Sequence, residues 1–160
     1  MTATTELDLI DRKIVASLME DASLSVARLA ERVGLSQTPC WKRIQKLESR
    51  GIITGRVARV DPAKLGLGLT VFVAIEATDH SSEWRDDFNS QIARHPEIVE
   101  AYRLAGPTDY LLRVVVKDMG AFDEFYRRLT NSVNVRNVTS HFAMEPVKDT
   151  KVLPIDTMNR

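Results

Sequence analysis

Residues 69–160 repeat one order of elements twice, and this repetition constrains the fold more than any other feature. Each half consists of a β-rich run, an amphipathic helical stretch and a second β-rich run, and the turn 106–109 separates the two halves. The four strands are expected at 69–77, 98–104, 110–116 and 135–144. This order predicts the α+β class, with a ferredoxin-like βαββαβ sandwich of four antiparallel strands and two helices on one face.

Two helices on one face leave the other face of the sheet uncovered. Valine and phenylalanine are frequent in the expected strands, so the open face should be partly apolar. We therefore expect a second, identical subunit to cover it and the chain to form at least a homodimer.

The first fifty or so residues are instead patterned for three helices, because apolar residues recur at steps of three and four. The apolar face of the first helix holds Leu7, Ile10, Ile14 and Leu18. Gly34 ends the second helix, Ser36 is a good N-cap for the third, and Gly51 ends it. Two short helices joined by a tight turn with glycine are typical of a helix-turn-helix unit, whose second helix enters the DNA major groove.

The third helix has an apolar inner face, where Cys40 should be a buried small hydrophobe rather than a redox sensor. Its outer face is polar and basic. Residues 36–60 carry six basic residues against Glu48 alone, although the whole chain balances 22 basic with 22 acidic residues. The residues predicted to contact DNA are Ser36, Gln37, Thr38, Trp41, Lys42, Arg43, Gln45, Lys46 and Arg50. Two alternatives remain: the face is an ordinary solvated surface, or Trp41 packs against the first helix.

These patterns divide the chain into three parts. We expect a helix-turn-helix domain at 1–52, a linker at 53–68 and a ferredoxin-like domain at 69–160 that binds a ligand and forms oligomers. Apolar and polar residues alternate along 53–60, which predicts a short strand in the linker.

Five segments resemble one known family in their order and spacing: IDRKI, LAERVGLSQTPCWKRIQKLESRGII, VDPAKLGLG, GPTDY followed by LLRVVV, and VKDTKVLP. Together they resemble the Lrp/AsnC family, the leucine-responsive and asparagine-linked (feast/famine) transcription regulators of bacteria and archaea. The resemblance extends from Leu7 to Leu153. The variants TPCWKR and HSSEW are similar to the branch that includes the bacterial cysteine-detoxification regulator.

The resemblance implies a winged-helix-like DNA-binding domain, an effector domain that binds an amino acid, possibly cysteine, and dimers that assemble into octamers. It places the effector near the turn 106–109, with Asp109 for the ammonium group and backbone N–H groups for the carboxylate. The implied effector-binding residues are Leu104, Ala105, Gly106, Thr108, Asp109, Tyr110, Thr139 and Ser140. The alternative is that Gly106 and Asp109 serve only to form the turn, which is plain turn chemistry. Pro107 has no N–H, so the turn has one backbone donor fewer for the carboxylate.

The sequence contains no pattern of an active site, a metal site or a cofactor site. His80, His95 and His141 lie far apart without metal-ligand spacing, and no Gly-rich phosphate loop or catalytic motif occurs. The single cysteine cannot form an intramolecular disulfide, and no apolar run has the length of a signal peptide or a membrane span, so a cytoplasmic protein is expected.

Three functions were therefore compared. A ligand-responsive, sequence-specific transcriptional regulator of double-stranded DNA is favoured, and a ligand-independent architectural protein that wraps DNA is the alternative. A small metabolic enzyme is disfavoured, because an enzyme gains nothing from the basic segment 36–60.

Overall fold

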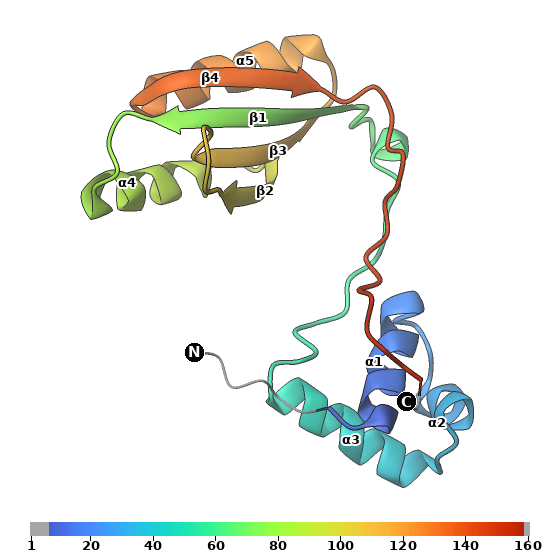
Figure 1. Cartoon of the computed structure of the whole chain (residues 1–160). Helices are drawn as coiled ribbons and strands as arrows, with labels where there is room; N and C mark the ends of the chain where they lie inside the picture. The colour runs from blue at the N-terminus through green and yellow to red at the C-terminus, as the bar shows by residue number, and fades with distance from the viewer. Residues whose placement is uncertain (1–6, 159–160) are drawn as a thin grey trace. The chain divides into compact units, whose positions relative to one another are not determined.

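The computed structural model describes residues 7–158 and contains two compact units (Figure 1). The N-terminal unit comprises residues 7–59 together with 148–158, and the C-terminal unit comprises residues 60–147. Within the described range, no helix has the length and apolar character needed to cross a bilayer.

The N-terminal unit contains the three predicted helices. They are α1 (Leu9–Glu20), α2 (Val26–Val33) and α3 (Gln37–Ser49). Side chains cap the first two helices, because Asp8 accepts a hydrogen bond from the Asp11 N–H and Ser25 accepts one from the Arg28 N–H. Ser36 occupies the N-cap position of α3 as predicted, but its side chain makes no cap bond. Gly34 turns the chain between α2 and α3 with a φ of 73°, in the left-handed region that favours glycine.

The core of this unit joins one face of each helix. Its buried members are Ile14, Leu18, Leu29, Ala30, Val33, Cys40, Ile44 and Leu47. The inward face predicted for the third helix is therefore confirmed, and Cys40 lies in the core with no exposed surface. Hydrophobic burial in this core fixes which side of α3 remains outside.

The linker differs from its prediction. Residues 53–60 form no strand, and Val57 in this segment is 85% exposed. A strand requires a hydrogen-bonded neighbour, and within residues 7–158 no segment pairs with this one. The only regular element of the linker is a single 3₁₀ turn, η1 (Ala63–Leu65).

The end of the chain makes contacts that no local pattern indicates. Residues 148–158 group with the N-terminal unit in the structure. The Leu153 N–H lies 3.5 Å from the Met19 sulfur on α1, and the Arg59 guanidinium donates to the Asp149 carbonyl oxygen at 3.3 Å. These contacts join residues that are far apart in sequence, which is why a local pattern did not predict them.

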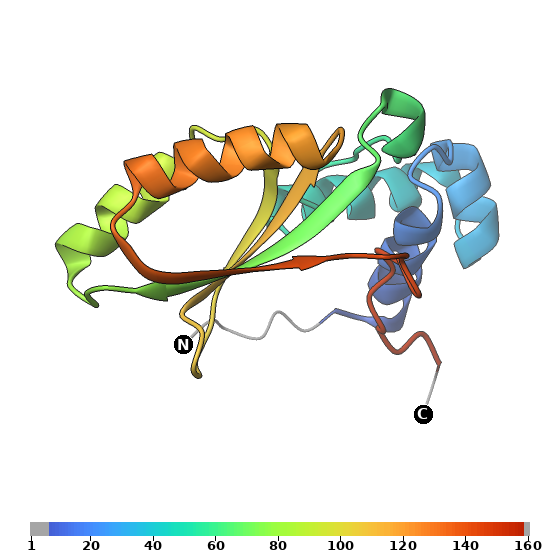
Figure 2. The same ribbon diagram turned by 90° about the horizontal axis from the view of Figure 1, so that it is seen from above.

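The C-terminal unit is the predicted ferredoxin-like sandwich. Its strands are β1 (Leu69–Ala77), β2 (Ile98–Arg103), β3 (Tyr110–Val116) and β4 (Val135–Phe142). They form one sheet in the order β2-β3-β1-β4, and every neighbouring pair is antiparallel. The helices α4 (Ser82–Ile92) and α5 (Met119–Ser132) both cover the same face of this sheet (Figure 2).

The two faces of the sheet have different compositions. The covered face and the helices share a core that includes Val71, Val73, Ile75, Phe88, Leu112, Val114, Phe125 and Leu129. On the open face, Phe72 and Tyr102 are 37% and 54% exposed, and Arg113 pairs with Glu100 at 2.7 Å. The open face is thus partly apolar, as the strand composition predicted.

Candidate functional site

The outer face of α3 gathers most of the residues predicted to contact DNA. The exposed members are Ser36, Gln37, Thr38, Trp41, Lys42, Gln45, Lys46 and Arg50. Lys42, Gln45 and Lys46 point away from the core residues of α3, because a helix returns to the same side about every 3.6 residues. Ser36, Gln37 and Arg50 are exposed instead at the two ends of the helix. The arrangement offers amide, hydroxyl and ammonium groups to a ligand from one convex surface.

Trp41 belongs to this surface and not to the core. Trp41 is 51% exposed and is not a member of the core of this unit, and the part of it that is covered leaves the alternative of packing against α1 open. An exposed indole on a polar helix face can make apolar contacts with a ligand such as the thymine methyl group.

Arg43 is the exception among the nine predicted residues. Its Nη1 atom lies 2.6 Å from an Asp8 oxygen and 2.7 Å from an Asp11 oxygen, so its guanidinium points toward α1. These two partners raise the pKa of Arg43 above its usual value. The backbone N–H of Asp11 is the main reason that the pKa of Asp8 is lowered, and Arg43 lowers it further.

Glu48, the one carboxylate within 36–60, is also occupied. One of its oxygens accepts a hydrogen bond from the Gln45 side-chain amide at 3.0 Å, and the other pairs with Arg56 at 3.3 Å. The negative charge on this face is therefore offset by Arg56, which reduces repulsion of an anionic ligand.

The loop 104–109, which we call the effector loop, joins β2 to β3. Gly106 has a φ of 153°, a backbone conformation that side-chain-bearing residues rarely adopt. The Leu104 N–H donates to the Asp109 carbonyl oxygen at 2.8 Å, and the Asp109 N–H donates to the Ile75 carbonyl oxygen at 3.0 Å. The loop is thus held at its base while Leu104, Ala105 and Gly106 remain exposed.

The Asp109 carboxylate has a structural partner in β1. Its Oδ2 accepts a hydrogen bond from the Ala77 N–H at 2.8 Å, and its Oδ1 lies 3.7 Å from His80 Nδ1. Ala77 lies where the register between β1 and β4 shifts, so the carboxylate supplies an acceptor at an irregular point of the sheet. The Asp109 side chain thus does not bond its own turn, as plain turn chemistry would have it, because its partner lies in β1.

The remaining predicted effector residues do not converge within one chain. The Tyr110 side chain is buried in the core, with its ring centroid 4.4 Å from that of Phe88. Thr139 and Ser140 are neighbours in β4 and therefore point to opposite faces of the sheet. Thr108 is half-buried at the end of the effector loop.

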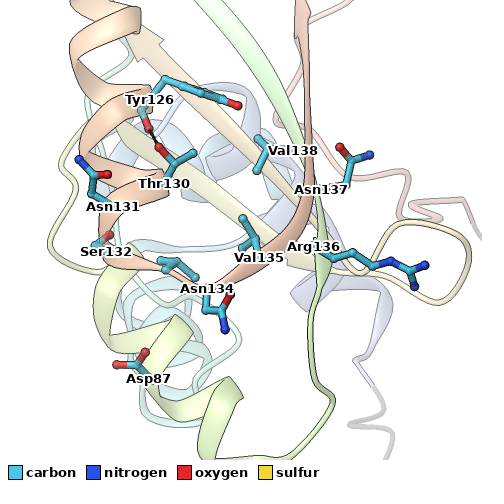
Figure 3. A pocket seen from close by; sticks show the side chains of 11 residues that line it. Asp87, Tyr126, Thr130, Asn131, Ser132, Asn134, Val135, Arg136, Asn137 and Val138 are labelled. Atoms are coloured by element: carbon cyan, nitrogen blue, oxygen red, sulfur yellow. Dashed lines mark hydrogen bonds between the residues drawn. The ribbon is translucent and has the colours of Figure 1, made fainter.

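A groove that no sequence pattern predicts lies between α5 and β4 (Figure 3). Its volume is about 730 Å³, and Tyr126 and Thr130 of α5 face Val135 and Val138 of β4 across it. A second groove of about 290 Å³ is lined by Ser140, Phe142 and residues of α5. The only sequence signal for the first groove is the run of polar residues between α5 and β4. Such runs are usual in surface loops and do not by themselves indicate a groove.

Among residues 7–158, no three His, Cys, Asp or Glu side chains are grouped so that they could hold a metal ion. Burial raises the pKa of the Cys40 thiol, which disfavours the reactive thiolate.

Two family models match the chain at the two units. The model of the Lrp/AsnC ligand binding domain matches residues 70–153, and a model described as winged helix-turn-helix DNA-binding matches residues 7–54. The chain belongs to the Lrp/AsnC family. It is a DNA-binding transcriptional regulator with a C-terminal ligand-binding domain, so the resemblance read from the sequence is confirmed.

Individual relatives of this Lrp/AsnC protein cover nearly the whole chain. The DNA-binding transcriptional activator DecR of Escherichia coli K12 is 53% identical over 94% of this chain and 99% of its own. The crystal structure of an AsnC family transcriptional regulator from Agrobacterium tumefaciens is 51% identical, with a TM-score of 0.90 over 96% of this chain and 100% of that one.

A third relative was solved with an amino acid bound. It is a transcriptional regulator from Neisseria meningitidis in complex with L-Met, which is 35% identical and has a TM-score of 0.88 over 93% of this chain and 97% of its own. The names of these three proteins describe transcriptional regulators and not enzymes.

Proposed function

We propose that this Lrp/AsnC regulator reads DNA sequence with the outer face of α3 and that an amino acid bound by its C-terminal unit alters that binding. The observation that carries the proposal is the exposure of eight polar, basic or aromatic side chains on the outer face and at the two ends of a helix whose inner face is buried. In this arrangement Gln37, Thr38 and Gln45 can hydrogen-bond base edges in the major groove.

Basic residues on the same surface supply the contacts to phosphate. Lys42, Lys46 and Arg50 are exposed, and each phosphate contact should release counterions. We expect Lys42→Met to weaken binding and to reduce the slope of log affinity against log salt by about 0.9 for each subunit that contacts the DNA, or about 1.8 for a dimer. Lys64→Met is the matched control, because Lys64 is an exposed lysine of η1 outside the helix-turn-helix unit. An unchanged slope in Lys42→Met would remove that residue from the phosphate contacts.

A homodimer is part of the proposal. The open face of the sheet exposes Phe72 and Tyr102, and a second copy of the chain would bury them. A dimer would present two α3 helices to half-sites about 34–36 Å apart, and dimers of this kind can assemble further into octamers. Light scattering should give at least twice the 18.0 kDa of one chain. Phe72→Asp should shift the protein toward the monomer, and a wild-type protein that is monomeric at micromolar concentration would contradict the dimer.

For the effector, we propose a free amino acid held at the effector loop. Backbone N–H groups of 105–108, apart from Pro107, can meet the carboxylate, and Asp109 Oδ1 can accept the ammonium group. Tyr110 can contribute only its backbone, because its ring lies in the core. Since the loop is exposed in one chain, a second subunit is expected to close the site.

Cysteine is the first candidate effector, on the branch resemblance of the TPCWKR and HSSEW segments. L-methionine is the second, because the related Neisseria regulator was solved with it. Calorimetry and thermal unfolding with a panel of amino acids test both, since a ligand that binds only the folded state raises the melting temperature.

The architectural alternative makes a different prediction. A protein that only wraps DNA would bind it with the same affinity in the presence and in the absence of every amino acid tested. Both the regulator and the architectural protein would act on DNA, so we expect this chain to act in the cytoplasm in either case.

A further inference from the structure

We propose that Arg43 is a positioning residue, which fixes the orientation of α3 on α1 and does not itself bind DNA. The proposal rests on the proposed function, in which α3 is the helix that reads DNA. It separates Arg43 from Lys42, its neighbour in sequence, although both residues lie in the basic segment.

The contacts of Arg43 connect two helices. A single nitrogen, Nη1, lies 2.6 Å from Asp8 Oδ2 and 2.7 Å from Asp11 Oδ1, so both of its hydrogens are directed at carboxylates. The partners are 35 and 32 residues away in the sequence, at the N-cap and in the first turn of α1. Charge-assisted hydrogen bonds of this length are among the stronger polar contacts in proteins.

Burial shows that the contact is part of the fold. The side chain of Asp11 is only 7% exposed and that of Arg43 is 33% exposed, whereas Asp8 is 53% exposed. A carboxylate as buried as that of Asp11 needs a cationic partner, because water no longer solvates its charge.

The geometry explains why positioning needs these bonds in addition to the core. Ile14, Cys40 and Ile44 hold α1 and α3 together through apolar contacts, which are non-directional. Two hydrogen bonds from one nitrogen constrain the rotation of α3 about its axis, and this rotation decides where Lys42 and Gln45 point. A small error in that direction weakens many DNA contacts at once.

The test compares three variants of the full chain by DNA affinity at several salt concentrations. Arg43→Met removes the tether and should lower affinity about tenfold, with a log affinity against log salt slope equal to that of the wild type. Lys42→Met should instead reduce the slope by about 1.8 for a dimer, because it removes one phosphate contact in each subunit. Arg43→Lys keeps the charge but replaces the planar guanidinium with a compact ammonium group, so it should restore only part of the lost affinity.

A second measurement follows the tether without DNA. Urea unfolding of Arg43→Met, Asp11→Asn and the double variant forms a double-mutant cycle, in which the two effects should be coupled by about tenfold in the unfolding constant. Should Asp11→Asn fail to fold, Asp8→Asn provides the cycle, because Asp8 is half exposed.

The results that would overturn the proposal are specific. A salt slope that falls in Arg43→Met as it does in Lys42→Met would make Arg43 a phosphate ligand, and additive effects in the unfolding cycle would remove the tether. If the wild type bound no DNA at all, the proposed function would fail, whereas the unfolding cycle would still decide whether the tether exists.

Discussion

Asp109 is predicted to have two separable roles, and two substitutions at this position distinguish them. One carboxylate oxygen accepts a hydrogen bond from the Ala77 N–H at 2.8 Å, and the other lies 3.7 Å from His80 Nδ1. Asp109→Asn keeps an oxygen that can accept the Ala77 bond but removes the charge. Asp109→Ala removes both.

The structural cost of the alanine substitution follows from burial. Ala77 is 7% exposed, so its N–H would lose its acceptor in a place that water reaches poorly. A hydrogen bond to a charged acceptor contributes about 1.5–3 kcal/mol, and an unsatisfied buried donor costs about 1–3 kcal/mol. Because the Asp109 side chain is itself 26% exposed, we take the lower half of this range and expect Asp109→Ala to lose about 2 kcal/mol. Asp109→Asn should lose less than about 1 kcal/mol.

Urea unfolding followed by circular dichroism measures this cost, and calorimetry with cysteine and L-methionine measures effector binding. We expect Asp109→Asn to unfold nearly as the wild type does and to lose the effector, because a neutral amide does not offset an ammonium charge. If Asp109→Ala were as stable as the wild type, the Ala77 contact would contribute nothing. If Asp109→Asn bound the effector as the wild type does, the carboxylate would not be the ammonium acceptor.

Three further predictions concern the cores. Phe88 is fully buried and stacked on Trp84, so Phe88→Ala should lower the free energy of unfolding by about 3–5 kcal/mol, measured by urea unfolding. A loss below about 1 kcal/mol would contradict the packing. The Cys40 thiol, whose pKa burial raises, should react with a thiol reagent only at the rate of unfolding, and rapid reaction of the folded protein would contradict its burial. Burial lowers the pKa of His95, so the folded state binds its proton less readily than the unfolded state. The stability that neutral His95 contributes to the folded state is complete above pH 6.5 and is lost as the pH falls through the folded pKa. The urea midpoints at pH 8 and pH 5 should therefore differ less in His95→Gln than in the wild type.

Features that depend on local periodicity were predictable from the sequence. The buried face of α3, with Cys40, Ile44 and Leu47, follows from helical spacing alone. The βαββαβ order follows from the repeated alternation of strand and helix patterns, and the sheet order β2-β3-β1-β4 agrees with it. Only the strand ends differ, since the last strand stops at Phe142 and not at residue 144.

Features that depend on a distant partner were not predictable. Arg43 was assigned to DNA from its place in a basic segment, because nothing local indicates a pair with Asp8 and Asp11 more than thirty residues earlier. The alternation of 53–60 is a local pattern, whereas a strand also needs a neighbour. The placement of 148–158 with the N-terminal unit depends on contacts with Met19 and Arg59.

The effector residues show the same limit. The resemblance places Thr139, Ser140 and Tyr110 around one ligand. In the structure, Thr139 and Ser140 are neighbours in β4 and point to opposite faces of the sheet, and the Tyr110 ring is buried in the core. A sequence motif indicates segments, whereas the pleat of the sheet decides to which face each side chain points.

The central claim, that the outer face of α3 reads DNA sequence, is tested most directly by selecting binding sites from a random double-stranded DNA library. The wild type should enrich a two-fold symmetric site whose half-sites are about one helical turn apart. Gln45→Ala, which changes only an exposed side chain of α3, should bind with a relaxed preference at the positions that Gln45 contacts. A folded wild-type protein that enriches no sequence, or a Gln45→Ala variant that enriches the same site at every position, would contradict the account.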